Sequence, residues 1–328
     1  MLDAAGRESA GIVVLHRDAD VQRAVQRYLR ATLRPVFLTP TPADARAAIA
    51  REHPELLIVE HAAIVDDPAL LADAAAAGVR RCLLAVGAAV DDTPALPAAP
   101  AGIDGFALSS LGALGPPRRV DELAVTALKL LRRDLFGMEK YLSWGFVPVC
   151  HRLTRAGDRR AVLDGIAAFV AERGLGPRLR WLATQTADEL ITNALFHGPV
   201  DAGGGHPRAA LPRADDFALG PDEEVTVRYG CDDRTFAIEV VDGWGSLDLT
   251  TLARCLRRSL GGGPLPRPAR TGGAGLGLAL TAGYVHHLVC NLEPARRTEL
   301  IALFDVAAPA VRLELTPSFH AFVSRGAA

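Results

Sequence analysis

The residues best suited to chemistry lie in three short segments of the second half of the chain. In the first, Glu189-Leu-Ile-Thr-Asn193-Ala-Leu-Phe-His197, polar side chains recur every four residues and would share one face of a helix. A carboxylate and an amide oxygen are hard ligands that suit Mg²⁺, and the carboxylate can also accept a proton from an attacking hydroxyl or water. An ordinary solvated helix face is the alternative interpretation of this stripe.

The second segment, Val241-Asp242-Gly243-Trp244-Gly245, follows an apolar strand. An Asp at the end of a strand can accept a hydrogen bond from an exocyclic amine, and the neighbouring glycines let the backbone approach a flat ligand. A simple Asp-Gly turn is the alternative interpretation.

The third segment, Gly272-Gly273-Ala274-Gly275-Leu276-Gly277-Leu278, opens a predicted helix. N–H groups at the start of a helix bind phosphate, and glycines allow the backbone to reach it. An Arg/Pro-rich loop, Pro264–Arg270, stands where a dinucleotide-binding motif would need a strand. This order favours a mobile lid over a dinucleotide site.

The pattern around these segments predicts helices on one side of a mostly antiparallel sheet. The predicted helices are Arg160–Val170, Leu179–Phe196, Leu249–Leu260 and Leu276–His286, and the predicted strands are Glu224–Tyr229, Thr235–Val241, Leu288–Leu292, Glu299–Val306 and Val311–Thr316. A stretch rich in Gly, Pro, Ala and Asp, 198–223, interrupts the pattern directly after the first segment.

The first half has a different pattern, in which short apolar strands alternate with helices. The predicted strands are Gly11–Leu15, Leu56–Val59 and Cys82–Val86, and the predicted helices are Asp20–Leu33 and Leu70–Ala77. Such alternation predicts a parallel sheet that is covered on both faces. One long amphipathic helix, Val120–Leu142, follows and is expected to connect two domains or to form a dimer seam.

Composition narrows the class of protein. The length of 328 residues predicts two domains, and 36 Lys and Arg against 38 Asp and Glu give a net charge of −2. The net charge gives no overall positive field that would attract nucleic acid or an anionic membrane. A local patch of positive charge is not excluded by this count. The five cysteines are scattered without a CxxC pair, and no apolar run is long enough to cross a membrane, so a cytoplasmic protein is expected.

Taken together and in this order, Glu-x-x-x-Asn, Asp-x-Gly-x-Gly and Gly-x-Gly-x-Gly resemble the GHKL (Bergerat) ATP-binding fold. Type II topoisomerases, heat-shock chaperone ATPases, sensor histidine kinases and anti-sigma-factor serine kinases share this fold. The resemblance covers 146–316 and implies a two-layer α+β sandwich that binds ATP with Mg²⁺.

The resemblance implies a role for each matching residue. Glu189 would be the catalytic carboxylate, Asn193 would bind Mg²⁺, and Asp242 would accept the adenine amine. The other nucleotide-binding positions would be His197 on the phosphate side, Gly243 and Gly245 beside Asp242, Gly273, Gly275, Leu276 and Gly277 along the phosphates, and Thr298 near adenine.

Among the branches of this fold, the first segment most resembles the anti-sigma-factor serine kinases. That branch implies phosphorylation or sequestration of a regulatory protein, either a sigma factor or an anti-anti-sigma-like protein. The insertion 198–223 replaces a short turn of those kinases and is expected to cover the site or to act as a docking arm. A histidine-kinase type is disfavoured because His151 lacks an acidic neighbour. A nucleotide-gated adaptor without catalysis is the main alternative.

The first half resembles the receiver domain of response regulators, a flavodoxin-like doubly wound fold, but without its chemistry. The acidic pair of a receiver aligns with His16 and Arg17, and the phosphorylated Asp aligns with Glu60. The Thr/Ser position falls near Gly87, and the Lys position falls near Ser109 or Ser110. The resemblance implies a pseudo-receiver that binds a partner or itself, or a domain kept only for packing.

The expected layout is therefore an α/β protein of two domains. It has a pseudo-receiver at 1–118, a connector helix at 119–145, an ATP-binding domain at 146–316 and a tail at 317–328. ATP and Mg²⁺ are the expected ligands, a regulatory protein is the expected partner, and a homodimer is left open.

Overall fold

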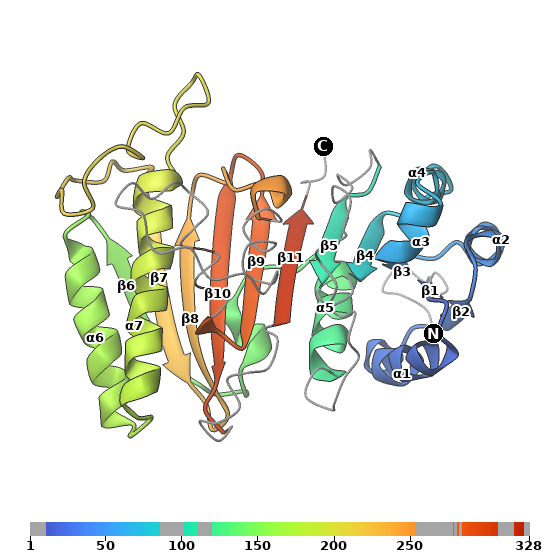
Figure 1. The fold of residues 1–328 in the computed structure, drawn as a ribbon, viewed down its shortest axis with the longest axis horizontal. Helices are drawn as coiled ribbons and strands as arrows, with labels where there is room; N and C mark the ends of the chain where they lie inside the picture. The colour runs from blue at the N-terminus through green and yellow to red at the C-terminus, as the bar shows by residue number, and fades with distance from the viewer. Residues whose placement is uncertain are drawn as a thin grey trace. The chain divides into compact units, whose positions relative to one another are not determined.

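The structure is a computed structural model that describes residues 11–85, 102–109, 120–252, 278, 281, 284–307 and 318–324. The chain has α/β architecture and forms two compact units (Figure 1). Unit 1 runs to Leu135 and includes the residues from His320 onward, and unit 2 runs from Phe136 to Phe319. No described helix is both long enough and apolar enough to cross a membrane.

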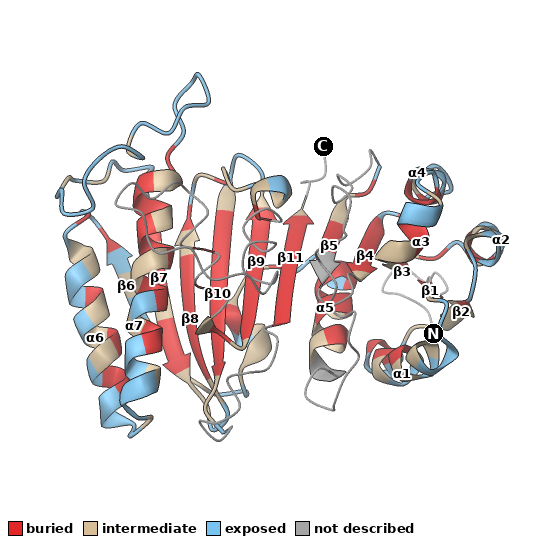
Figure 2. Cartoon of the chain, viewed as in Figure 1, coloured by how far each residue is buried: buried red, intermediate tan, exposed pale blue. Residues whose placement is uncertain are grey.

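The sheet of unit 1 has the strand order β2-β1-β3-β4-β5-β11. Its parallel strands are β1 (Ile12–Leu15), β2 (Val36–Thr39), β3 (Leu56–Glu60), β4 (Arg81–Ala85) and β5 (Gly105–Ser109). The strands β1, β3 and β4 are almost entirely buried (Figure 2), which explains their continuous apolar sequences. The predicted parallel sheet is thus observed.

Helices cover the sheet of unit 1 on both faces. α1 (Ala19–Leu29) packs with α5 (Val120–Arg132), α2 (Pro42–Glu52) packs with α4 (Leu70–Ala76), and α3 (His61–Asp66) follows β3. Asp18 caps α1 by accepting hydrogen bonds from the backbone N–H groups of Asp20 and Val21, at 2.7 and 3.3 Å. These N–H groups hold the pKa of Asp18 below its ordinary value because they stabilise the carboxylate.

The helix predicted over Val120–Leu142 is shorter in the structure. α5 ends at Arg132, and Arg133 then adopts a left-handed backbone with a φ of 54°. The predicted apolar stripe continues past the break because Leu135 and Met138 are also buried. The apolar face of α5 packs against α1 and the strands β3, β4 and β5, so it does not form the free seam that a dimer helix requires.

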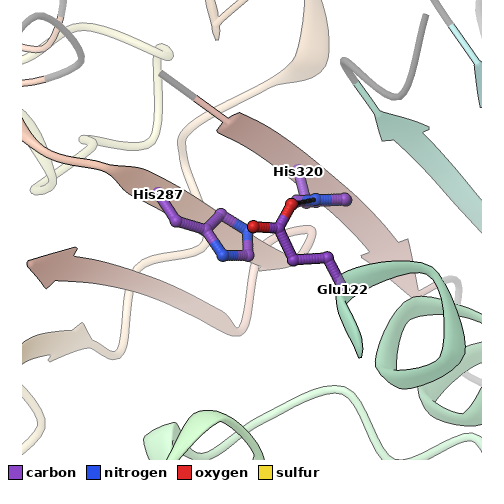
Figure 3. Close-up of side chains that lie close together, drawn as sticks. All are labelled: Glu122, His287 and His320. Carbon is purple, nitrogen blue, oxygen red and sulfur yellow. Dashed lines mark hydrogen bonds and ion pairs between the residues drawn. The ribbon is translucent and has the colours of Figure 1, made fainter. Parts of the chain in front are cut away.

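Within the segment expected as a tail, residues 318–324 form strand β11 (Ser318–Ser324). β11 pairs antiparallel with β5, with His320 opposite Ser109 and Ser324 opposite Gly105. The buried His320 faces Glu122 of α5 (Figure 3), and 3.4 Å separate His320 Nε2 from Glu122 Oε2. The end of the described chain is therefore built into unit 1.

Unit 2 contains an antiparallel sheet with the strand order β9-β10-β8-β7-β6. Its strands are β6 (Val149–Leu153), β7 (Val225–Cys231), β8 (Thr235–Asp242), β9 (His287–Glu293) and β10 (Arg297–Asp305). The helices α6 (Asp158–Glu172) and α7 (Pro177–Thr192) lie on one face of this sheet (Figure 1), as the sequence predicted. The predicted strand Val311–Thr316 lies outside the described residues.

The opposite face of this sheet carries two buried carboxylates, Glu239 on β8 and Glu299 on β10. The backbone N–H of Met138 donates to Glu239 at 2.8 Å, and the N–H of Gly137 donates to Glu299 at 2.9 Å. Arg228 of β7 forms ion pairs with Glu239 and with the more exposed Glu139. The short 3-10 helix η4 (Met138–Tyr141) and the residues before it are thereby fastened to the sheet.

Candidate functional site

A cavity of about 120 Å³ lies between α7 and the sheet of unit 2. Apolar and polar residues line it in about equal number: Leu190, Asn193, Ala194, His197, Gly198, His206, Val240, Asp242, Ser246, Leu247, Asp248, Thr251, Leu278, Thr298 and Leu300. An apolar cavity of roughly 150 Å³ holds a benzene ring, so this volume suits a flat ring of similar size. Apolar walls with convergent polar groups are typical of a small-molecule site.

The end of α7 decides which of its polar side chains reach the cavity. The α-helix stops at Thr192 and continues as a π-helical turn, η5 (Asn193–His197), in which the N–H of Gly198 donates to the carbonyl of Asn193 at 2.7 Å. Asn193 and His197 line the cavity, whereas Glu189 does not. The stripe expected from i, i+4, i+8 spacing is thus only partly in the cavity lining, because Glu189 lies outside it. The π-helical turn lies between the two residues that do line the cavity, and turns of this kind are frequent at functional sites.

Asp242 closes one end of the cavity at the last position of β8, where it is only 7% exposed. Its Oδ1 accepts a hydrogen bond from the N–H of Trp244 at 3.0 Å. Burial raises the pKa of Asp242 to about 6, although the N–H groups of Trp244 and Gly245 act in the opposite direction. A buried carboxyl of this kind is a specific hydrogen-bonding group for a ligand.

The turn after Asp242 depends on Gly245, which has a φ of 58°. A Cβ at this position would overlap the backbone of Glu293 and Arg296 in the turn between β9 and β10. Gly243 and Gly245 do not belong to the described lining of the cavity, so Gly245 serves the turn that positions Asp242.

One buried polar atom of the cavity wall, Nδ1 of His197, has no hydrogen-bond partner among the described residues. The hydroxyl of Thr298 lies opposite Asp242 in the pairing of β10 with β8 and opposes the rise in the pKa of that carboxyl. Buried polar atoms in folded proteins are nearly always paired, because an unpaired one costs about 1–3 kcal/mol. The unpaired nitrogen of His197 therefore favours a ligand with a hydrogen-bonding group.

The insertion 198–223 forms part of the site. His206 lines the cavity, and Arg213 Nη1 lies 3.2 Å from Oε2 of Glu189. Burial lowers the pKa of His197, and the charges of Arg213 and His206 lower it further. The imidazole of His197 is therefore biased toward its neutral form, in which one ring nitrogen can accept a hydrogen bond.

The structure brings together Asn193, His197, Asp242 and Thr298 from the set predicted from the sequence. Gly273, Gly275, Leu276 and Gly277 lie outside the described residues, while Leu278 directly after them lines the cavity. Sequence reasoning missed two groups. His206 and Arg213 sit in an insertion without periodicity, and Ser246, Asp248 and Thr251 follow the Asp-Gly segment.

No protein-family model matches the chain, and no curated protein matches it.

A second group of predicted residues meets at the end of β3 in unit 1. The backbone N–H of Arg17 donates to Glu60 Oε1 at 2.9 Å and its Nε donates to the same oxygen at 3.2 Å. His16 Nε2 lies 3.6 Å from the other oxygen, Glu60 Oε2. His16 and Arg17 thus both contact Glu60, and Arg17 supplies a positive charge beside its carboxylate. Gly87 and Ser110 lie outside the described residues, and of Ser109 only the backbone is described, as the last residue of β5.

Glu60→Gln is expected to lower the free energy of unfolding by about 1 kcal/mol, because the partly buried carboxylate that accepts hydrogen bonds from the cationic Arg17 loses its charge. Thermal unfolding should then begin a few degrees lower. Asp66→Asn is the control, since Asp66 pairs with the same Arg17 on the exposed surface and should change stability very little. Equal melting temperatures for wild type and Glu60→Gln would contradict this assignment.

Proposed function

We propose that unit 2 binds ATP with Mg²⁺ in the cavity beside α7, and that the chain is a signalling regulator that phosphorylates or sequesters a regulatory protein. One observation carries the proposal. The buried carboxyl of Asp242 and the hydroxyl of Thr298 lie opposite each other on paired strands, in a cavity that Asn193 and His197 from the end of α7 also line.

The cavity supports recognition of an adenine base. Leu190, Val240 and Leu300 supply apolar walls for a flat ring, and Asp242 can accept a hydrogen bond from an exocyclic amine. The hydroxyl of Thr298 can donate or accept beside it, which suits a ring that carries both an amine and a ring nitrogen. This set of donors and acceptors fits a purine with an amino group.

The opposite side of the cavity supports binding of the phosphates. The half-buried amide of Asn193 offers an oxygen ligand for Mg²⁺, which proteins bind through few side chains together with phosphate and water. Bound Mg²⁺ would neutralise charge on the phosphates during transfer. Glu189 lies one helical turn before Asn193, where its carboxylate can accept a proton from the hydroxyl of a partner protein.

The two units fit the finer folds expected from the resemblance. The parallel order β2-β1-β3-β4-β5 is that of flavodoxin-like proteins, which supports a pseudo-receiver for unit 1. Two helices on one face of an antiparallel sheet support a Bergerat sandwich for unit 2. Of the signalling branches, the position of His151 on the strand β6 disfavours a histidine kinase, whose phosphoacceptor lies on a helix.

A nucleotide-gated adaptor without catalysis is the second candidate. The observation that favours it is that Glu189 lies outside the cavity lining and forms an ion pair with Arg213. The kinase and the adaptor share the ATP site and differ only in whether phosphate reaches a protein.

Glu189→Gln is expected to reduce transfer of labelled phosphate by at least about a hundredfold while ATP binding stays equal or becomes tighter. The purified chain is incubated with γ-labelled ATP and protein extract of its own source, and phosphoserine is identified on the labelled product. Glu172→Gln at the end of α6 is the control for loss of a carboxylate. If Glu189→Gln still transfers phosphate at the wild-type rate, Glu189 is not the base. If wild type binds ATP and labels no protein, the adaptor replaces the kinase.

A further inference from the structure

The second half of the insertion is a fixed part of unit 2. Asp216 pairs with Arg155 at 2.7 Å and accepts the N–H of Gly157 at 2.9 Å. The N–H of Ala156 donates to the carbonyl of Phe217 at 2.9 Å, and the ring of Phe217 packs edge-on against Phe196 of the π-helical turn. These contacts join the insertion both to the start of α6 and to the end of α7.

Arg213 is held at a defined point between these contacts. Its carbonyl accepts a hydrogen bond from Arg159 Nη2 at 3.2 Å, and Arg159 Nη1 also donates to Thr192 of α7 at 2.8 Å. The guanidinium of Arg213 then reaches Glu189, whose side chain is 17% exposed, while its own side chain is 48% exposed. The insertion therefore presents a permanent positive charge next to the end of α7.

The position of this charge matters because Glu189 is a carboxylate close to the proposed phosphate side of the cavity. A polyphosphate and a carboxylate repel each other, and this repulsion is stronger near a partly buried site than in bulk water. A single contact with Arg213 leaves other lone pairs of the carboxylate free, and Arg has five N–H donors in a planar fork. Arg213 can thus compensate the charge of Glu189 without blocking it.

We propose that Arg213 is a positioning residue that fixes the carboxylate of Glu189 and supplies the positive charge that lets a polyphosphate bind beside it. This inference deepens the proposed function and rests on it for the location of the phosphates. It assigns to the insertion a role in the ligand site itself and makes the ligand class a polyphosphate ester rather than a neutral nucleoside.

The experiment measures binding of adenosine, AMP, ADP and ATP, each with Mg²⁺, by calorimetry at low and high salt. Arg213→Gln is expected to weaken ATP binding about five- to tenfold at low salt, to weaken AMP binding less, and to leave adenosine binding unchanged. Arg213→Lys should restore most of the ATP affinity because it keeps the charge. Arg234→Gln, in the turn at the far end of β8, removes the same charge away from the cavity and should have no effect.

A double variant separates the charge effect from a structural one. In Glu189→Gln/Arg213→Gln both charges are absent, so ATP affinity should return to within about threefold of wild type. A structural role for Arg213 would leave the double variant as weak as the single one, and that result would overturn the inference. Equal loss of adenosine and ATP affinity in Arg213→Gln would overturn it as well.

Inorganic triphosphate distinguishes failure of this inference from failure of the proposed function. One possible result is that wild type binds triphosphate more tightly than Arg213→Gln does, and that neither binds an adenine nucleotide. This result would refute the ATP site and retain the role of Arg213. If wild type and Arg213→Gln bind ATP with the same affinity, the ATP site is retained and the role of Arg213 is refuted.

Discussion

Asp242→Asn is expected to weaken binding of Mg·ATP by at least about a hundredfold and at the same time to stabilise the protein above pH 7. The carboxyl is the buried acceptor of the cavity, and an amide presents an N–H₂ group where the ligand amine must donate. Sites built around a buried hydrogen bond discriminate strongly against a mismatched partner. Calorimetric titration with Mg·ATP measures this loss directly.

The gain in stability follows from the sign of the pKa change. The pKa of Asp242 rises from 3.8 to about 6 in the folded protein, so folding favours the protonated carboxyl. The associated stability is fully present below pH 3.8 and is lost as the pH rises through 6. Each pKa unit corresponds to about 1.4 kcal/mol, so Asn removes a cost of up to roughly 3 kcal/mol at pH 8.

Thermal unfolding at pH 4 and pH 8 tests this part of the prediction. The variant should melt higher than wild type at pH 8 and close to wild type at pH 4. Asp233→Asn, in the exposed turn before β8, is the control and should change neither binding nor stability. Unchanged ATP affinity in Asp242→Asn would refute an adenine site at this carboxyl, and a lower melting temperature at both pH values would indicate misfolding instead.

Glu299→Gln is expected to stabilise the protein above pH 7 by up to roughly 3 kcal/mol. Burial and the nearby charge of Glu239 raise the pKa of Glu299 from 4.5 to about 7, while Asn291 and the N–H of Gly137 oppose the rise. Stability from this group is complete below pH 4.5 and declines as the pH rises through 7. Glutamine keeps an oxygen that can accept the N–H of Gly137 and removes the buried charge.

Glu239→Gln is the matched control because it lies on the same buried face but pairs with Arg228. Removing this partner leaves Arg228 with less compensation, so we expect a loss of stability at every pH. Denaturant unfolding between pH 4 and pH 9 measures both variants. A wild-type stability that does not fall between pH 5 and pH 8, or falls as steeply in Glu299→Gln, would contradict the assignment to Glu299.

Local sequence patterns predict the elements of this fold well where burial imposes a clear periodicity. The strands β1, β3 and β4 are mostly apolar because both faces are covered, and β7 and β8 closely match the predicted strands Glu224–Tyr229 and Thr235–Val241. The strand β2 and the helix α2 were not predicted. Val36–Thr39 is an edge strand that is mostly only half-buried, and α2 has alanine in place of the large apolar residues that mark a helical face. The end of α5 was not predicted either, since buried Leu135 and Met138 continue the apolar spacing after the helix has stopped.

The candidate site is only partly predictable for a related reason. Spacing identifies Asn193, His197, Asp242 and Thr298, which the fold then brings to one cavity. Spacing cannot reveal that Glu189 pairs with Arg213 of the insertion and stays outside the cavity lining. It also cannot reveal the π-helical turn that begins at Asn193, because one extra residue in a turn leaves no mark on composition. The contribution of Arg213 depends on an insertion whose path is set by ion pairs and backbone contacts with α6 and not by its own hydrophobic pattern.

The pairing of β11 with β5 means that unit 1 is discontinuous in sequence. The residues of unit 2 lie, along the chain, between two strands of unit 1 that pair with each other. During synthesis the residues of unit 2 therefore emerge from the ribosome before the last strand of unit 1. Domains generally fold in their order of synthesis, but here the first unit cannot be completed before the second has emerged. Until His320–Ser324 emerge, the edge of β5 carries unsatisfied backbone groups, which are prone to wrong pairing. Completion of the first unit is thus tied to completion of the second during biosynthesis.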